Sequence, residues 1–395
     1  MARVLFAWEF GGDLGHVRRI VPIARELRAI GHEPVLAFRD LTALAAHVHE
    51  DFEWLAAPRL RGRAQPNPSP LNASDILLNL GFGDPPGLSG ALRAWLALFN
   101  ILDPALIVAD YAPTALLAGR AAQRARITLG TGFALPPRAD PLPALRSWAP
   151  CDEATLRGID GRLLAAIDAA LQRLPKGAQA LRHVSSLYDS RAHLLCTFPE
   201  IDPFGPRDDV EYLGPQADGS GIRVSWTSAK RKVFAYLKPR DARFGAIVSA
   251  LDRLGAEAIV AAPGLDPQDA AALATSRVRV FAEPVDLETV LPDCDLCVCP
   301  GGPGLVARAW LAGVPMGLAP MQLEQFLVAR RALQAGVASM VAPDAPAPDF
   351  AAWFAALLED TKLREMARER AREHLGYRFD QAAKRIALRI AREIA

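Results

Sequence analysis

The chain has 395 residues, 51% of them hydrophobic, and its formal net charge is +1 at pH 7. This length exceeds one ordinary hydrophobic core and predicts two domains, while the near balance of charge argues against disorder and against general nucleic-acid binding. No apolar run is long enough to span a membrane, and the N-terminus leads directly into a strand rather than a signal peptide, so we expect a cytoplasmic protein.

The first forty residues have the pattern of a strand, a helix and a second strand. Residues 3–10 and 34–38 are apolar runs, and residues 17–30 carry apolar side chains at helical spacing. This βαβ unit is typical of a doubly wound parallel sheet in an α/β protein. The turn between strand and helix contains Gly15 and His16, at the sheet edge where ligands bind in such folds. His16 is a candidate general base, and the alternative is a residue that caps the helix or fills the turn.

The segment from Pro58 to Pro86 is rich in Pro, Asn, Ser and Gly, which predicts a long irregular lid or binding loop. Its apolar residues either contact a hydrophobic ligand or pack against the domain: Leu77, Leu78, Leu80 and Phe82. Residues 103–109 then predict a strand with Asp110 at its carboxyl end. Asp110 is a candidate cap for the helix after Pro113.

Further along, residues 155–188 are predicted to be helical, and residues 216–228 have the composition of a linker. The second half of the chain repeats the alternation of strands and helices, with predicted strands at 232–237, 258–262 and 278–281 and helices at 244–254 and 267–275. A helical region with many charges, 361–395, ends the chain. The sequence therefore predicts two α/β halves.

Three cysteines, Cys294, Cys297 and Cys299, lie in or beside the apolar run 291–299, which predicts a buried parallel strand. Metal binding by this cluster is one interpretation. Small apolar core residues are the favoured one, because no histidine is close in sequence.

The most specific pattern follows that strand, in DLCVCPGGPGLVARAWLAGVPMGLAPMQLEQ at residues 295–325. The glycine-rich turn 300–304 passes directly into a predicted helix. Such a turn is a potential anion site, because glycine lets the backbone approach a phosphate and the unpaired amides at a helix start favour negative charge. A short strand and turn at 315–320 then lead to Glu324 and Gln325, which open another helix.

This spacing resembles the donor-nucleotide signature of inverting glycosyltransferases of the GT-B fold, namely the plant and macrolide enzymes and, more distantly, MurG. The residues in register are Gly301, Gly302, Gly304, Gly313, Val314, Pro315, Pro320, Glu324 and Gln325. Gly15-His16, Pro22 and Gly31-His32 are similar to the N-terminal pattern of the same superfamily. The resemblance covers nearly the whole chain.

The resemblance implies two Rossmann-like domains that face a cleft: an acceptor-binding domain at 1–216 and a nucleotide-sugar-binding domain at 217–377. A C-terminal helix, 378–395, would cross back to the first domain. The segment 58–86 would hold the acceptor. Residues 127–133, 194–203 and 210–215 resemble the remaining strands of the first domain of bacterial members.

The implied activity is metal-independent transfer of a hexose, with inversion, from a nucleotide-diphosphate sugar to a hydroxyl of a small-molecule or lipid-like acceptor. The donor would be a UDP or dTDP sugar, used as co-substrate without a bound cofactor. His16 would deprotonate the hydroxyl, and Asp110 would orient it and stabilise its charged form. The diphosphate would bind at the turn that includes Gly301, Gly302, Gly304 and Leu305, and Glu324 and Gln325 would bind sugar hydroxyls.

Three positions depart from the superfamily pattern: the phosphate-binding His is Pro300, the Thr or Ser is Leu305, and the ribose-binding Glu is Arg308. Arg308 cannot accept hydrogen bonds from ribose but can attract phosphate. Lys238 and Arg240 stand where the superfamily has another phosphate-binding turn, and they either bind phosphate or are solvated charges. The departures support an alternative, a catalytically impaired GT-B protein that binds nucleotide sugars or activates a partner enzyme. A sugar-nucleotide epimerase, which needs no acceptor, is a third interpretation.

Overall fold

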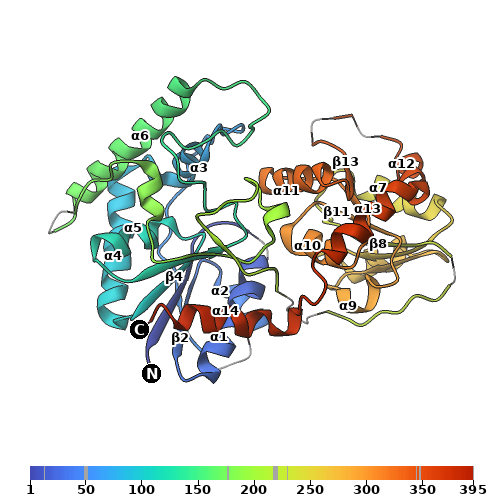
Figure 1. Ribbon diagram of the computed structural model, residues 1–395, viewed down its shortest axis with the longest axis horizontal. Coiled ribbons are helices and arrows are strands. Elements are labelled where there is room, and N and C mark those ends of the chain that lie inside the picture. The colour runs from blue at the N-terminus through green and yellow to red at the C-terminus, as the bar shows by residue number, and fades with distance from the viewer. Residues whose placement is uncertain are drawn as a thin grey trace. The chain divides into compact units, whose positions relative to one another are not determined.

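The computed structural model describes residues 1–12, 14–48, 52–175, 178–216, 221–228, 230–343, 345–346 and 348–394 (Figure 1). Contacts divide the chain into two compact units, one containing residues 1–196, 206–216 and 380–395 and the other residues 197–205 and 217–379. The expected linker, 216–228, is described only in part, since residues 217–220 and the boundary expected there lie outside the described residues. No helix in the described ranges is long and apolar enough to cross a membrane.

The first unit is built on a parallel sheet of seven strands in the order β3-β2-β1-β4-β5-β6-β7. The strands are β1 (Arg3–Trp8), β2 (Glu33–Phe38), β3 (Glu53–Ala56), β4 (Leu106–Asp110), β5 (Arg126–Gly130), β6 (His193–Leu195) and β7 (Glu211–Tyr212). The central strands are apolar on both faces because helices cover both sides of the sheet. In β1, for example, Phe6 and Trp8 face one layer while Leu5 and Ala7 face the other.

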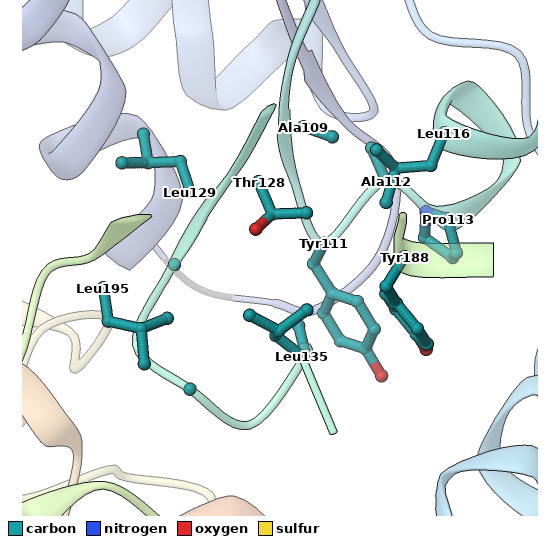
Figure 2. A pocket seen from close by; sticks show the side chains of 13 residues that line it. Ala109, Tyr111, Ala112, Pro113, Leu116, Thr128, Leu129, Leu135, Tyr188 and Leu195 are labelled. Atoms are coloured by element: carbon teal, nitrogen blue, oxygen red, sulfur yellow. The ribbon is translucent and has the colours of Figure 1, made fainter. Parts of the chain in front are cut away.

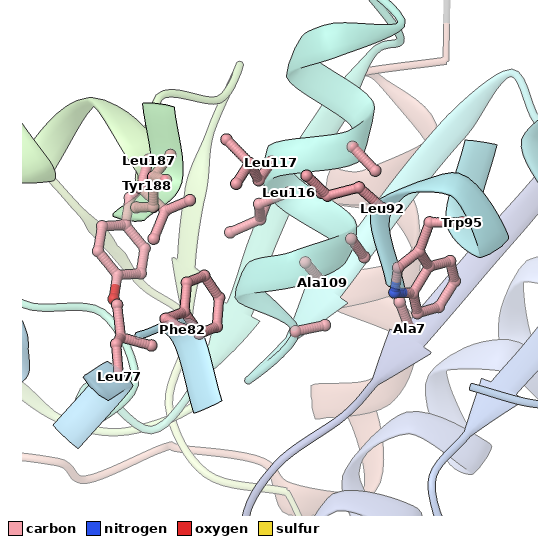
Figure 3. Close-up of a cluster of buried hydrophobic side chains, with 14 of the residues drawn as sticks. Ala7, Leu77, Phe82, Leu92, Trp95, Ala109, Leu116, Leu117, Leu187 and Tyr188 are labelled. Atoms are coloured by element: carbon pink, nitrogen blue, oxygen red, sulfur yellow. The ribbon is translucent and has the colours of Figure 1, made fainter. Parts of the chain in front are cut away.

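Two helical layers bury these faces. The layer that packs on Phe6 and Trp8 includes α1 (Gly15–Ala29) and α14 (Ala382–Ala391), which lie side by side in Figure 1. The opposite layer contains the largest core of the unit, where Trp95 and Leu116 pack beneath the sheet (Figure 3). Its main helices are α4 (Pro85–Leu102), α5 (Pro113–Ala121) and α6 (Glu153–Gln172), and the unit also contains α2 (Leu41–His47), α3 (Ala73–Leu77), a π-helical turn (Leu78–Phe82) and a 3-10 turn (Val184–Tyr188).

The second unit repeats the architecture with a parallel sheet of six strands in the order β10-β9-β8-β11-β12-β13. Its strands are β8 (Lys232–Tyr236), β9 (Glu257–Ala261), β10 (Val278–Phe281), β11 (Leu296–Cys299), β12 (Met316–Leu318) and β13 (Ala338–Met340). Its helices are α7 (Phe244–Arg253), α8 (Pro267–Leu273), α9 (Leu287–Val290), α10 (Pro303–Leu311), α11 (Leu323–Gln334), α12 (Phe350–Glu359) and α13 (Thr361–Arg372). Helices α10 and α11 pack on one face, and α7 and α12 on the other. The prediction of an α/β fold with two parallel sheets is confirmed.

Several predicted elements have different bounds in the structure. The strand expected at 291–299 is only β11, because the preceding apolar residues form the end of α9 and a turn; a short apolar run does not distinguish these conformations. The helix expected at 155–188 stops with α6 and resumes only at the 3-10 turn, since Pro175 cannot continue the helical hydrogen bonds. The C-terminal helical region is likewise interrupted, at Gly376, whose φ is +89°.

The predicted irregular segment 58–86 is also partly wrong, because it contains α3, the π-helical turn and the start of α4. Asn72 accepts a hydrogen bond from the amide of Asp75 and begins α3. A residue type typical of loops is here a helix cap. Strand β13 and helix α12, at 338–340 and 350–359, were not predicted from the sequence.

Candidate active site

The fold of the first unit brings His16 and Asp110 together. Strand β1 ends at Trp8, and His16 lies in the first turn of the helix that follows. Asp110 is the last residue of β4, the strand beside β1, and pairs in register with Trp8. Parallel neighbours end at the same sheet edge, so the two side chains meet there. Nδ1 of His16 lies 3.0 Å from Oδ1 of Asp110, and Asp110 is 1% exposed.

Asp110, Trp8 and Gly11 are among the neighbours that hold the His16 ring. Nδ1 of His16 faces the Asp110 carboxylate, which only accepts hydrogen bonds when ionised, and Nε2 lies on the opposite side of the ring, away from that carboxylate. Trp8 stacks on the ring with centroids 4.9 Å apart. Gly11 lies against Nε2, since a Cβ atom there would come within 2.5 Å of that nitrogen. The ring position therefore requires a glycine at residue 11, where φ is +86°.

Arg19 is a third member of this cluster and was not predicted from the sequence. Its Nε donates to Oδ2 of Asp110 at 2.9 Å, and its Nη2 lies 3.3 Å from Oδ1 and 3.1 Å from Nδ1 of His16. Burial opposes ionisation of Asp110, but the charges of Arg19 and His16 outweigh it and hold the pKa of Asp110 below its usual value. The spacing of three residues between His16 and Arg19, one helical turn, was the available signal.

Asp110 does not cap α5, so that alternative is wrong. The first residue outside the helix is Ala112, and the amides of Thr114 and Ala115 donate to Glu9 at 3.1 and 2.6 Å. Burial raises the pKa of Glu9 to about 8, although the hydrogen bonds from Thr114 and Ala115 oppose the shift. Sequence reasoning missed Glu9, because its partners lie more than a hundred residues away.

A pocket opens beside Asp110 at the ends of β4 and β5 (Figure 2). Its lining is mostly apolar, with two tyrosines: Ala109, Tyr111, Ala112, Pro113, Leu116, Thr128, Leu129, Gly130, Gly132, Ala134, Leu135, Tyr188 and Leu195. The rings of Tyr111 and Tyr188 lie side by side in Figure 2, with both hydroxyl groups pointing the same way. Tyr111 also approaches Gly11, because a Cβ atom on that glycine would be 3.3 Å from the Tyr111 ring. His16 and the pocket therefore meet around Gly11.

The expected acceptor region is held by a buried polar cluster. Asp160 of α6, 3% exposed, accepts hydrogen bonds from the Ser74 hydroxyl at 2.6 Å, the Asn72 amide at 2.9 Å and the Leu142 backbone at 2.8 Å. Leu77, Leu78 and Phe82 are buried in the core and Leu80 packs against it. Of the two interpretations of these apolar residues, packing against the domain is the one that the structure shows.

In the second unit, the glycine-rich turn joins β11 to α10. Gly301 has φ of +92°, and a Cβ atom there would come within 2.9 Å of the backbone oxygen of Gln325. Gly302 begins α10, Pro303 follows as its first residue, and no side chain caps the helix. Nothing lies within 4 Å of the Cβ positions of Gly302 and Gly304. The start of α10, including the amides of Gly304 and Leu305, thus has the geometry of an anion site.

Gln325 and Glu324 lie in the first turn of α11, as predicted. Gln325 is buried, and its Oε1 accepts a hydrogen bond from the Met321 amide at 2.9 Å. The NH₂ group and the second lone pair of Oε1 of Gln325 therefore remain to bind a ligand through the side chain. Glu324 is half-buried beside it.

The predicted cations of the second unit differ in their surroundings. Arg308 is 9% exposed; its guanidinium lies 4.3 Å from the Phe379 ring centroid and 3.6 Å from the Glu288 carboxylate. Nζ of Lys238 lies 5.4 Å from the ring centroid of Tyr236, and Arg240 is exposed.

Arg243, which was not predicted as a site residue, organises the loop after β8. It pairs with Asp241 at 2.9 Å and donates to the backbone oxygens of Ala319 and Pro320 at 2.9 and 3.0 Å. Arg243 thus joins the loop after β8 to the loop that leads to Glu324.

The cysteines of β11, Cys297 and Cys299, are buried in the core of the second unit. Cys294 is half-buried beside them, and burial raises the pKa of its thiol to about 12. These cysteines pack as small apolar residues.

No family model matches the chain, and no curated protein does. Solved structures match it over nearly its whole length. A glycosyltransferase of kitacinnamycin has 21% identity and a TM-score of 0.69, covering 100% of this chain and 98% of its own. Glycosyltransferase VinC, solved in complex with dTDP, has 16% identity and a TM-score of 0.68, covering 99% of each chain. The spinosyn rhamnosyltransferase SpnG, solved with the spinosyn aglycone, has 20% identity and a TM-score of 0.66, covering 99% of this chain and 100% of its own.

These similarities show the fold. The two parallel sheets and their helices have the GT-B arrangement of glycosyltransferases, as the resemblance in residues 295–325 implied. Sequence identities of 16–21% support a shared fold and do not by themselves show a shared activity.

Proposed function

We propose that this protein is an inverting glycosyltransferase that moves a hexose from a nucleotide-diphosphate sugar to a hydroxyl of a small-molecule or lipid-like acceptor. The observation that carries the proposal is the His16–Asp110 contact at the carboxyl edge of a GT-B sheet. We infer from it that Nδ1 of His16 carries the imidazole proton and that Nε2 is the proton acceptor. A histidine held by a buried carboxylate is an arrangement suited to general-base catalysis.

In the proposed reaction, Nε2 of His16 takes the proton of the acceptor hydroxyl, and the oxygen attacks the anomeric carbon of the donor. A new carbon–oxygen bond forms as the bond to the diphosphate breaks, and the nucleoside diphosphate leaves with the bonding electrons. One such displacement inverts the anomeric configuration. Asp110 keeps the imidazole in the correct tautomer and stabilises the imidazolium. The first domain, 1–216 as expected, binds the acceptor.

The donor site lies in the second domain, 217–377 as expected. The turn that includes Gly301 and Gly302 and the amides of Gly304 and Leu305 bind the diphosphate, and no metal ion takes part in the step. VinC and SpnG have both been solved with thymidine diphosphate, which supports a dTDP donor, with UDP as the alternative.

The remaining donor contacts come from the loop after β8, from α10 and from the start of α11. Glu324 and the free NH₂ group of Gln325 bind sugar hydroxyls. Lys238, Arg240 and Arg308 add positive charge that stabilises the leaving diphosphate. Because Arg308 already lies beside Phe379 and Glu288, its contribution is long-range unless the Glu288 contact opens.

A second candidate is a catalytically impaired GT-B protein that binds a nucleotide sugar or activates a partner glycosyltransferase. The surroundings of Arg308 favour it: the side chain that occupies the ribose-binding position is committed to Phe379 and Glu288. Pro300 likewise has no donor for a phosphate. Each lost polar contact weakens donor binding by about 1–3 kcal/mol.

The test is a panel of UDP, dTDP and GDP sugars in thermal melting and hydrolysis assays. A donor raises the melting temperature because it binds only the folded protein, and the same compound should be hydrolysed slowly as water replaces the acceptor. His16→Ala should abolish turnover and leave calorimetric dTDP binding unchanged. His32→Ala, at the Gly–His pair that follows α1, is the matched control. Binding without turnover, whatever acceptor is added, would favour the second candidate.

A further inference from the structure

The charge of the cluster around His16 distinguishes it from a simple histidine–carboxylate pair. Such a pair carries −1 at rest and becomes neutral when the histidine takes a proton. Here Arg19 already neutralises Asp110 through hydrogen bonds of 2.9 and 3.3 Å, so the group of three residues is neutral at rest and carries +1 once His16 is protonated. The site therefore has an unbalanced positive charge at the moment when the acceptor oxygen loses its proton.

We propose that this cluster matches the site to an acceptor whose reacting hydroxyl is acidic, as in a phenol or an enol, and that it binds such an acceptor as its anion, with the hydroxyl proton transferred to Nε2 of His16. The proposal rests on the proposed function, since it assigns the acceptor class of the same site. Arg19 acts as a positioning residue through Asp110 and His16. An acceptor that carries its own negative charge supplies the counter-charge that Asp110, shared with Arg19, no longer provides.

Other titratable groups lie at or near this edge of the sheet. Nη1 of Arg39, which follows β2, donates to the backbone oxygen of Gly11 at 2.6 Å and adds a second cation. Cys196, after β6, is buried and its thiol has a pKa raised to about 12, so it stays neutral. Glu9 is directed to the α5 amides by its two hydrogen bonds. Asp110 is the carboxylate that hydrogen-bonds to His16 and Arg19, and Asp40 lies near Arg39.

The pocket beside the cluster has two tyrosine rings in its wall. Gly130 lines the pocket and also lies next to Asp110, because a Cβ atom on this glycine would be 3.8 Å from the carboxylate. Tyr111 approaches Gly11, the residue that contacts Nε2 of His16, and Tyr111 and Tyr188 present neighbouring rings in Figure 2. Aromatic walls favour an aromatic ligand through stacked or edge-to-face contacts. Pocket and cluster together point to a phenol-like acceptor rather than an aliphatic alcohol.

The experiment uses 4-nitrophenol with the full-length protein and no nucleotide sugar. The coloured anion reports ionisation directly, so its absorbance across pH gives the pKa of the bound phenol. In the wild-type protein we expect this pKa to fall by about one unit, a tenfold rise in the ionisation constant. Arg19→Gln should remove the shift, and Arg19→Lys, which keeps the charge, should retain most of it. Arg25→Gln, an exposed arginine of the same helix, is the control.

Nitrophenol that does not bind, or that binds with an unchanged or raised pKa, would overturn the proposal. A shift that survives in Arg19→Gln would do the same. If Arg19→Gln fails to fold, Arg19→Lys is compared with the wild type instead. Arg19→Lys should keep most of the pKa shift of the bound nitrophenol, and added guanidinium should not increase that shift beyond the wild-type value. The nitrophenol titration needs no donor, so it is independent of the transfer assay. A lowered pKa of bound nitrophenol in a protein that shows no transfer with any donor would refute the proposed function alone. Transfer confined to aliphatic alcohols, with no shift, would refute only this inference.

Discussion

Replacing Asp110 with Asn tests how the buried cluster is held together. The amide is close to isosteric, so the substitution removes charge with little change of volume. It leaves the guanidinium of Arg19, whose side chain is 10% exposed, without its counter-ion. Removing one partner of a buried ion pair costs about 3–5 kcal/mol. Because the Asn oxygen can still accept one hydrogen bond from Arg19, we expect the lower end, about 3 kcal/mol of unfolding free energy in the first unit.

The loss should depend on pH in a defined direction. The folded-state pKa of Asp110 lies below the ordinary value of 3.8, which we take for the unfolded chain. The unfolded state therefore binds the proton first, and the stabilisation by Asp110 is complete above that value and lost as pH falls through the folded pKa. The stability difference between wild type and Asp110→Asn should thus be constant near neutral pH and shrink only below 3.8.

Hydrogen exchange of peptides from β1 and β4 is the appropriate assay, because the chain has two compact units and a global transition would not separate their stabilities. A double-mutant cycle with Arg19→Gln completes the test. The double variant should be less destabilised than the sum of the single variants, since neither charge is then left unpaired. An additive cycle, or a difference that does not change with pH, would show that the charges of Asp110 and Arg19 are not coupled as the distances indicate.

Two glycine substitutions probe the two halves of the site. Gly11→Ala places a Cβ atom 2.5 Å from Nε2 of His16 at a φ of +86°, so we expect a loss of roughly 1–3 kcal/mol in thermal melting and roughly 100-fold in transfer rate. Gly12→Ala, with nothing within 4 Å, should change neither, and equal effects would contradict the steric explanation. Gly301→Ala brings a Cβ atom within 2.9 Å of the backbone oxygen of Gln325 and should weaken calorimetric dTDP binding at least tenfold. Gly245→Ala in α7, with nothing within 4 Å, is its control, and unchanged dTDP affinity in Gly301→Ala would remove the turn from the donor site.

Local patterns in the sequence were sufficient for the framework. Buried parallel strands are continuous apolar runs and helices have a period of 3.6, so β1, α1 and β2 were located within two residues at most ends. The edge rule for parallel sheets located His16 at the ligand-binding edge, and the resemblance to GT-B enzymes supplied its pairing with Asp110. The glycine pattern at 301–304 likewise identified a turn that requires positive φ at Gly301.

The tertiary structure decided which side chains actually meet. Arg19, Glu9 and Arg243 look like ordinary charged residues in the sequence, and their roles come from partners on distant strands and loops. The composition of 58–86 is typical of a loop and did not predict α3. The polar side chains of Asn72 and Ser74 are buried there because both donate hydrogen bonds to Asp160, a residue of α6. Sequence patterns report local conformation and burial, whereas the energy of a buried charge depends on whichever opposite charge the completed fold brings within hydrogen-bond distance.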